Sequence, residues 1–194
     1  MQLYSYVSKE YHAYDKRRDD IIRASRDVLR NAKKIIFLCH EGKLIEAEKM
    51  LNSSTVNIVK LEAKFSKPLS SHSKNFNAYS EGSWSAGVEE YLEALFFFAI
   101  LKNKKLTLPK SIMPSAPVVV GALSDMTGEL VRVSVNRGAK KAYDDLEYFR
   151  KVTAEVVKQL LPLHLTGQSR QKFDSAKRNL KRIEEIIYEV NIRS

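Results

Sequence analysis

The sequence predicts an all-α protein, and three observations support that prediction. Glycine and proline are scarce, with 7 and 5 residues among 194, and no Asn-Gly pair offers a hairpin turn. Leucine, isoleucine, valine, alanine, lysine and glutamate are abundant instead. Apolar residues also recur at helical spacing in several long segments. We therefore expect one domain over residues 1–194, a bundle of about six or seven helices.

The first part of the chain contains two predicted helices. One spans residues 9–39, because its apolar residues, such as Ile21, Val28 and Ile35, follow one another at helical spacing. The other spans residues 44–63. The letters "NSST" mark a point where this second helix can break, since serine and threonine side chains compete for backbone hydrogen bonds.

The middle of the chain alternates between polar connections and one very apolar segment. Residues 64–87 are rich in serine and asparagine and are predicted to be mainly a loop, with Trp84 anchoring that loop or a contact between subunits. Residues 87–102 form a predicted helix with apolar side chains on every side, which indicates a helix enclosed by others. Residues 102–117 carry three prolines and form a second connection.

The remaining sequence predicts three further helices. The first covers residues 118–138 and ends near Gly138, because glycine is the preferred residue just beyond a helix end. Two amphipathic helices follow, over about residues 143–163 and 169–190. No internal repeat interrupts this pattern.

The charge of the chain indicates an anionic partner. Lysine and arginine outnumber aspartate and glutamate by 33 to 23, and the formal net charge is +10. Basic surfaces attract phosphate backbones through long-range fields and counterion release, so nucleic acid is the natural candidate. A basic protein without a specific anionic partner is the alternative. No acidic residue lies between Glu93 and Asp125, and that gap contains Lys102, Lys104, Lys105 and Lys110.

The number of cysteines and the hydropathy of the chain exclude further classes of protein. Cys39 is the only cysteine, which excludes an intrachain disulfide and a zinc site of several cysteines. The first residues show no apolar signal segment, and no uncharged stretch reaches the roughly 20 residues of a membrane span. We therefore expect an intracellular, cytoplasmic protein that does not enter membranes.

Four acidic residues lie in the two most apolar helical segments. Glu90 and Glu93 are three residues apart, and Asp125 and Glu129 are four apart, so each pair projects from one side of its helix. A buried carboxylate must be protonated, joined to a cation or bound to a metal. All-oxygen ligands suit Mg²⁺ or Mn²⁺. If the two helices lie together, the spacing predicts a divalent metal held by the four acids.

Two other interpretations of these acids remain open. Arg132 follows Glu129 by three residues and can neutralise one carboxylate as a simple ion pair. Carboxylates in helical bundles also hold redox iron, but those sites use Glu-x-x-His motifs, and none of the four acids is followed by histidine at that spacing. The sequence therefore favours a non-redox metal over iron.

Several segments resemble the translin family. The stretch "GALSDMTGELVRVSVNRG" is similar to the "ADLTGELMR" region of that family, and "EEYLEA" is similar to the acidic helix of its TRAX branch, the translin-associated factor X proteins. The stretch "DKRRDDIIRASRDVLRNAKKIIFLCH" resembles the first long helix of the family, and "KRIEEIIYEVNIRS" its last helix. The resemblance covers nearly the whole chain, with the motifs in the family's order.

The resemblance implies a fold, an assembly and an activity. Members of the family form barrel-like octamers that bind single-stranded nucleic acid, and TRAX-type subunits carry the acidic catalytic site. The acids at matching positions here are Glu90, Glu93, Asp125 and Glu129, which implies a TRAX-type subunit. We therefore expect a Mg²⁺- or Mn²⁺-dependent endoribonuclease that cleaves single-stranded RNA, with single-stranded DNA as a second ligand, inside a homo-octamer.

Basic residues must then hold the substrate. Lys33 and Arg132 match basic positions of the TRAX pattern, and Arg26 lies seven residues before Lys33 on the same face of the first helix. We expect Lys33 and Arg132 near the scissile phosphate, with Arg26 supporting them. The alternative function is a non-catalytic scaffold that binds single-stranded nucleic acid, in which the acids are structural ion pairs.

Overall fold

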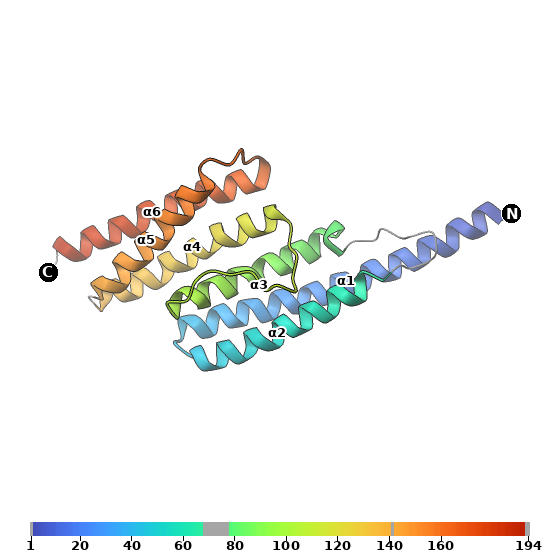
Figure 1. Ribbon diagram of the computed structural model, residues 1–194, viewed down its shortest axis with the longest axis horizontal. Helices are drawn as coiled ribbons and strands as arrows, with labels where there is room; N and C mark the ends of the chain where they lie inside the picture. The colour runs from blue at the N-terminus through green and yellow to red at the C-terminus, as the bar shows by residue number, and fades with distance from the viewer. Residues whose placement is uncertain (1, 68–77, 141, 193–194) are drawn as a thin grey trace. The chain divides into compact units, whose positions relative to one another are not determined.

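The computed structural model describes residues 2–67, 78–140 and 142–192, and this part of the chain is helical without strands (Figure 1). The elements are α1 (Gln2–His40), α2 (Leu44–Phe65), a short 3₁₀ helix η1 (Ala78–Ser80), α3 (Gly82–Leu101), α4 (Ala116–Ala139), α5 (Tyr143–Leu160) and α6 (Gly167–Ile192). The all-α prediction is confirmed. Among the described residues, no helix combines the length and the apolar character needed to cross a membrane.

The second helix continues through the point where a break was expected. Ser53 Oγ donates a hydrogen bond to the Met50 carbonyl at 2.9 Å, and Thr55 Oγ1 donates to the Leu51 carbonyl at 2.9 Å. These hydroxyl groups therefore donate to carbonyl groups of the preceding helical turn, and they do not replace the backbone hydrogen bonds of the helix. As a result α2 runs without interruption from Leu44 to Phe65.

Helix α3 begins five residues earlier than the sequence indicated. Gly82 to Ala86 belong to the helix, so the prediction of a loop up to residue 87 is wrong at that end, and residues 68–77 of that loop lie outside the described residues. Trp84 is fully buried inside α3, and its ring meets the Phe65 ring edge-on at 5.5 Å between centroids. Burying this large ring outweighs the weak helix preference of the serines around it.

The chain divides into two compact units, each built from two segments. The first contains Met1–Tyr91 and Thr107–Val118, and the second contains Leu92–Leu106 and Val119–Ser194. Helices α3 and α4 therefore each contribute residues to both units. The expectation of a single domain over residues 1–194 stays a prediction.

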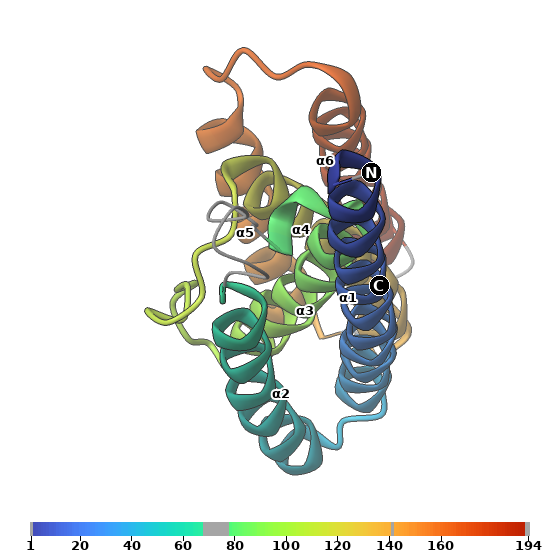
Figure 2. The ribbon, with the colours of Figure 1, turned by 90° about the vertical axis from the view of Figure 1, so that its right-hand side faces the viewer.

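The first unit is organised around the pair α1 and α2. These helices lie side by side and are joined by a short turn (Figure 2). Gly42 closes the end of α1 with φ +73°, a conformation that favours glycine, and Lys43 N–H then bonds to the Leu38 carbonyl at 2.9 Å. The buried apolar residues of this unit include Ile21, Val28, Ile35, Leu51, Ile58, Phe65, Trp84 and Tyr91.

Helices α1 and α3 approach each other closely at Gly87. A methyl group added to this glycine would lie 3.1 Å from the backbone carbonyl oxygen of Ser25 in α1. The contact is to backbone, which cannot swing aside as a flexible side chain would. Glycine at position 87 therefore sets how closely the two helices pack.

In the second unit, helices α5 and α6 form a further pair and pack with the later parts of α3 and α4. Asn179 Nδ2 in α6 donates a hydrogen bond to Thr127 Oγ1 in α4 at 2.8 Å, which fixes the register of these two helices. The buried apolar residues of this unit include Phe96, Phe97, Met126, Leu130, Leu146, Phe149, Phe173, Ala176, Ile183 and Ile186.

We predict that Gly87→Ala lowers the free energy of unfolding by about 1–3 kcal/mol, because α1 must move to admit the methyl group. Gly82→Ala on the same helix is the matched control, since an added methyl there meets nothing within 4 Å. Urea denaturation of both variants measures the difference. Equal stability of the two variants would contradict the close contact at position 87.

Glu62 supplies a prediction of pH dependence. Burial raises the pKa of its carboxyl, and the hydrogen bond that Tyr79 donates to it, 2.5 Å long, opposes that rise. A raised pKa favours the folded state at low pH, and this contribution is lost as the pH rises through the folded pKa. Glu62→Gln keeps an oxygen that accepts the Tyr79 bond and cannot ionise.

We therefore expect Glu62→Gln to be more stable than the wild type at pH 7, and the difference to shrink as the pH falls toward about 4, where a carboxyl of ordinary pKa protonates. Unfolding curves between those two values measure the trend. A stability difference that stayed constant over the whole pH range would show that the ionisation of Glu62 is not its cause.

Candidate functional site

The buried acid predicted in α3 is present in the structure. Glu93 is 8 % exposed and lies among buried apolar residues of the same helix, such as Leu92, Phe96 and Phe97. Glu90 lies one turn earlier, belongs to the first unit and is half-buried. The prediction that Glu93 is buried is therefore confirmed. A carboxylate in this setting costs stability unless a positive group or hydrogen-bond donors accompany it.

The two acids predicted in α4 are half-buried. Asp125 and Glu129 both belong to the second unit, as does Glu93. Polar side chains in the same part of α4 are satisfied inside the helix: Ser124 Oγ donates to the Val120 carbonyl at 2.8 Å, and Thr127 Oγ1 donates to the Ser124 carbonyl at 2.6 Å. These hydroxyl groups therefore donate their hydrogen bonds to backbone carbonyl groups rather than to the acids.

Each acid of α4 has a cation beside it. Arg132 Nη1 lies 3.7 Å from Glu129 Oε2 on the same helix, as the ion-pair interpretation anticipated, and its side chain is 61 % exposed. An exposed pair of this length contributes little to stability. Lys172 in α6 was not among the predicted site residues, yet its Nζ lies only 2.5 Å from Asp125 Oδ2. Nothing in the local sequence of either helix points to this contact between residues 47 positions apart.

The acids meet only one of the two requirements of a metal site. Four carboxylates are the donor set that Mg²⁺ or Mn²⁺ prefers, so the residues fit such an ion by chemistry. Within the described residues, however, no group of three or more histidine, cysteine, aspartate or glutamate side chains is gathered as a metal ion would need. The four-acid metal site thus stays a prediction.

Basic residues line a groove in the first unit. Arg26, Arg30 and Lys33 project from α1 at helical spacing and are exposed, and Ser83 and Ala86 of α3 complete the walls of this groove of about 620 Å³. Two of the predicted RNA-binding residues, Arg26 and Lys33, thus share one surface. Arg30 was missed, although its i+4 and i−3 spacing to them places it on the same face.

The third predicted RNA-binding residue lies elsewhere in the chain. Arg132 is exposed on the part of α4 that belongs to the second unit, where it pairs with Glu129. The predicted RNA-binding residues therefore belong to both units. Arg26 and Lys33 line a groove on α1, which we call the α1 groove, and Arg132 lies beside an acid of α4.

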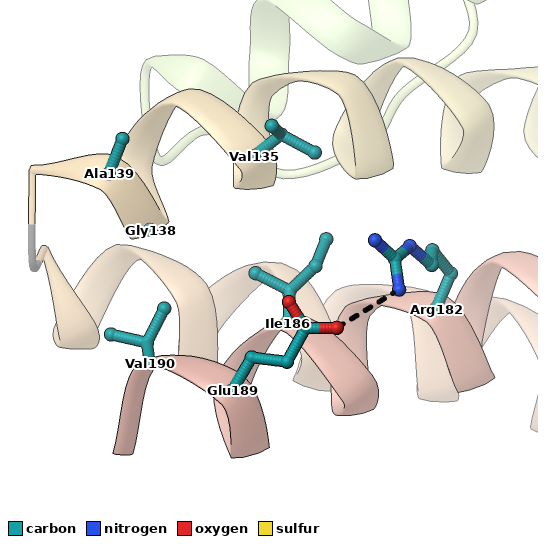
Figure 3. A pocket seen from close by; sticks show the side chains of 7 residues that line it. All are labelled: Val135, Gly138, Ala139, Arg182, Ile186, Glu189 and Val190. Atoms are coloured by element: carbon teal, nitrogen blue, oxygen red, sulfur yellow. Dashed lines mark hydrogen bonds and ion pairs between the residues drawn. The ribbon is translucent and has the colours of Figure 1, made fainter. Parts of the chain in front are cut away.

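Another pocket lies between the ends of α4 and α6, and Figure 3 shows its side chains. The pocket has a volume of about 370 Å³, and Val135 and Gly138 of α4 face Ile186 and Val190 of α6 across it. An ion pair of 3.4 Å joins Arg182 to Glu189 of α6. Gly138 permits this approach, because an added methyl would lie 3.1 Å from Val190. None of the residues predicted to act on RNA lines this pocket.

Burial also makes Cys39 an unsuitable nucleophile. Its side chain is buried at the end of α1, and removal from water raises the pKa of the thiol to about 12. A thiol with that pKa is almost entirely protonated at neutral pH. The acids and the α1 groove therefore remain the candidates for a functional role.

Known proteins share both the sequence pattern and the fold of this chain. Residues 16–194 match the model of the Translin family. A translin-associated protein X homolog of Schizosaccharomyces pombe is 26% identical over 190 residues, which cover 91% of this chain and 82% of that protein.

Solved structures share the fold. The crystal structure of AfC3PO superposes with a TM-score of 0.83 at 17% identity and covers 100% of this chain and 98% of its own. A complex of AfC3PO with duplex RNA matches equally well, and apo-NeC3PO gives a TM-score of 0.83 over 98% of both chains. With the family model matching nearly the whole length, this chain belongs to the Translin family.

Proposed function

We propose that this chain is a nucleic-acid-binding subunit of the TRAX type that hydrolyses single-stranded RNA with Mg²⁺ or Mn²⁺ held by Glu90, Glu93, Asp125 and Glu129. The observation that carries the proposal is the burial of Glu93, at 8 % exposure, within the apolar length of α3. A carboxylate placed in so apolar a helix needs a compensating partner, and a bound metal ion is one group that can compensate it. Family membership and the chemistry of the donor set support the same conclusion.

In this mechanism the chain binds and positions the RNA. Arg26, Arg30 and Lys33 of the α1 groove neutralise successive phosphates, and Arg132 offers a further guanidinium beside Glu129. The carboxylates supply the oxygen ligands. When bound, Mg²⁺ or Mn²⁺ lowers the pKa of a coordinated water and neutralises charge on the phosphate. No histidine is needed as a base.

The RNA complex among the similar structures contains duplex RNA and describes AfC3PO. For this chain we propose single strands as the substrate, because the resemblance to the TRAX branch of the translin family implies them. Binding assays with single-stranded and duplex RNA of the same sequence distinguish the two. We further propose that the subunits form a homo-octamer, which light scattering on the purified protein measures directly.

A non-catalytic scaffold is the second candidate, and one observation favours it. Lys172 lies 2.5 Å from Asp125 Oδ2, so at least one of the acids already has a cation of the chain beside it. In a scaffold, that contact is purely structural and no metal is required. The two functions differ in whether the acids are needed for cleavage of RNA.

The cleavage test uses substitutions that preserve side-chain size. We expect Glu93→Gln and Asp125→Asn to lose Mn²⁺-dependent cleavage of labelled single-stranded RNA. Substituting a residue that supports a metal ligand lowers metal affinity or activity by roughly 10- to 100-fold. We expect the loss of a ligand itself to lower the cleavage rate by at least as much. Glu46→Gln, an exposed acid at the start of α2, is the control. Binding of RNA without cleavage by the wild type would reject the nuclease and favour the scaffold. Cleavage that persists in the two variants or in excess EDTA would reject the metal-dependent mechanism at these acids.

The α1 groove gives a separate prediction on binding. Replacing Arg26, Arg30 or Lys33 by alanine should weaken single-stranded RNA binding. For each phosphate that is no longer neutralised, the slope of log K against log salt should become shallower by about 0.7. Lys34→Ala is the matched control, because Lys34 is exposed on α1 and does not line the groove. Fluorescence anisotropy over a salt series measures both quantities. An unchanged slope in the groove variants would place the RNA on another surface.

A further inference from the structure

The first turns of α1 extend past the end of the helix that packs beside it (Figure 1). Helix α1 has 39 residues and α2 has 22, so at the usual rise per residue their lengths are about 58 and 33 Å. Helix α2 ends beside Arg17, whose Nη1 donates a hydrogen bond to the Phe65 carbonyl at 2.9 Å. One turn earlier, Tyr14 Oη donates to Glu81 Oε1 at 3.5 Å.

The start of α1 carries large apolar side chains on its surface. No side chain of residues 2–20 is buried, and Ile21 is the first buried residue of the helix. Four apolar residues of this segment lie on one side of the helix, and we call them the N-terminal stripe: Leu3 is 67 % exposed, Tyr4 80 %, Val7 51 % and Tyr11 64 %. Exposed apolar residues gathered in this way mark an interaction site.

The N-terminal stripe continues the pattern by which α1 packs inside its own chain. Starting at Tyr4, steps of three and four residues alternate through Val7 and Tyr11 and continue into the second half of the helix. There the same steps fall on buried residues: Ile21, Ser25, Val28, Ala32, Ile35 and Cys39. Alternating steps of three and four form the seam of helices that pack side by side. The chain itself covers the later part of this seam and leaves the first part exposed.

The charge of this segment favours a protein over a nucleic acid as its partner. Residues 2–20 contain four basic and four acidic side chains, although the whole chain has a formal net charge of +10. The segment therefore lacks the excess of positive charge with which a surface attracts phosphates, and it does not repel a second copy of this basic chain. Tyrosine is also enriched at the centre of protein interfaces, because its ring is apolar while its hydroxyl group can stay hydrated.

A second copy of the chain offers a matching surface. A seam of this spacing packs best against another helix with the same spacing, because the side chains of each helix then fit between those of the other. Outside residues 2–20, the large exposed apolar side chains of the described residues lie singly or in pairs along the chain. The N-terminal stripe of a second copy is therefore its closest complement, and a surface that complements itself gives a closed two-fold contact.

We propose that the N-terminal stripe is a contact surface between copies of this chain, in which the first turns of α1 from two subunits pack along their seams. The inference rests on the proposed function only for the expectation that subunits assemble, and it requires neither a metal nor RNA. It gives the start of α1 the same role toward a second subunit that the later part of the helix has toward its own chain.

The first test compares charges introduced on the stripe and away from it. Val7→Lys combined with Tyr11→Lys places two charges in the contact, whereas Ser5→Lys combined with His12→Lys adds lysines at exposed positions on the other side of the same turns. We expect the stripe variant to dissociate at a protein concentration at least about tenfold higher than the wild type, because it loses a buried tyrosine of the interface. The control variant should match the wild type. Light scattering over a dilution series measures the mass of each.

Cross-linking through an introduced thiol supplies a second readout. Cys39 is buried and its thiol has a pKa of about 12, so it reacts poorly with maleimides. A short bis-maleimide should join two chains of Val7→Cys. It should not join chains of Lys9→Cys, because residue 9 is exposed on the side of the helix opposite Val7. Circular dichroism checks that each variant keeps the helical fold, which residues of this exposed segment do not support from inside the core.

The outcomes separate this inference from the function proposed above. If the wild type assembles and the stripe variant keeps the same mass, the stripe contact is overturned and the assembly stands. If the wild type is a monomer at every concentration, the stripe contact and the homo-octamer both fail, and the RNA cleavage assay decides the nuclease separately. If the stripe variant assembles normally but loses affinity for single-stranded RNA, the tyrosines stack on bases instead, which also overturns the inference. Dissociation of the stripe variant with selective cross-linking of Val7→Cys supports it.

Discussion

The burial of α3 is the constraint on which the rest of this structure depends. From Tyr91 to Ile100 nearly every side chain of the helix is buried, and the helix contributes residues to both compact units. An apolar helix of this kind is stable only when other helices enclose it. The enclosure that stabilises its aromatic residues also removes Glu93 from water. The burial of α3 therefore stabilises the fold and, at the same time, makes the charged form of Glu93 unfavourable unless it has a partner.

Most of the basic side chains described above lie on exposed helix faces. The α1 groove and Arg132 keep their positive charge at the surface, where phosphates can reach it. Lys172 is instead half-enclosed, since packing between α4 and α6 holds it against Asp125. One chain thus uses its positive charge in two ways, as a surface for anions and as a counter-ion for an acid.

The helices followed from local patterns, and their departures from prediction have tertiary causes. Periodic apolar residues indicated α2, α5 and α6 to within three residues, because each helix buries one face. They also indicated the end of α1, whereas α1 begins at Gln2, seven residues before the expected start. The start of α3 was missed. Its serines predict a loop, and in the structure the burial of Trp84 against Phe65 offsets their weak helix preference. The acid pairs on α3 and α4 could be recognised, since their i+3 and i+4 spacings are properties of single helices.

The sequence by itself determined the fold class, the family, the burial of Glu93 and the face shared by Arg26 and Lys33, because each of these depends on composition, motifs or spacing along one helix. The tertiary structure decided which residues from different helices meet. It brought Lys172 to Asp125 across 47 positions and set α1 against α3 at Gly87. Contacts of that kind depend on the register and the distance between helices, and no periodicity within either helix encodes them.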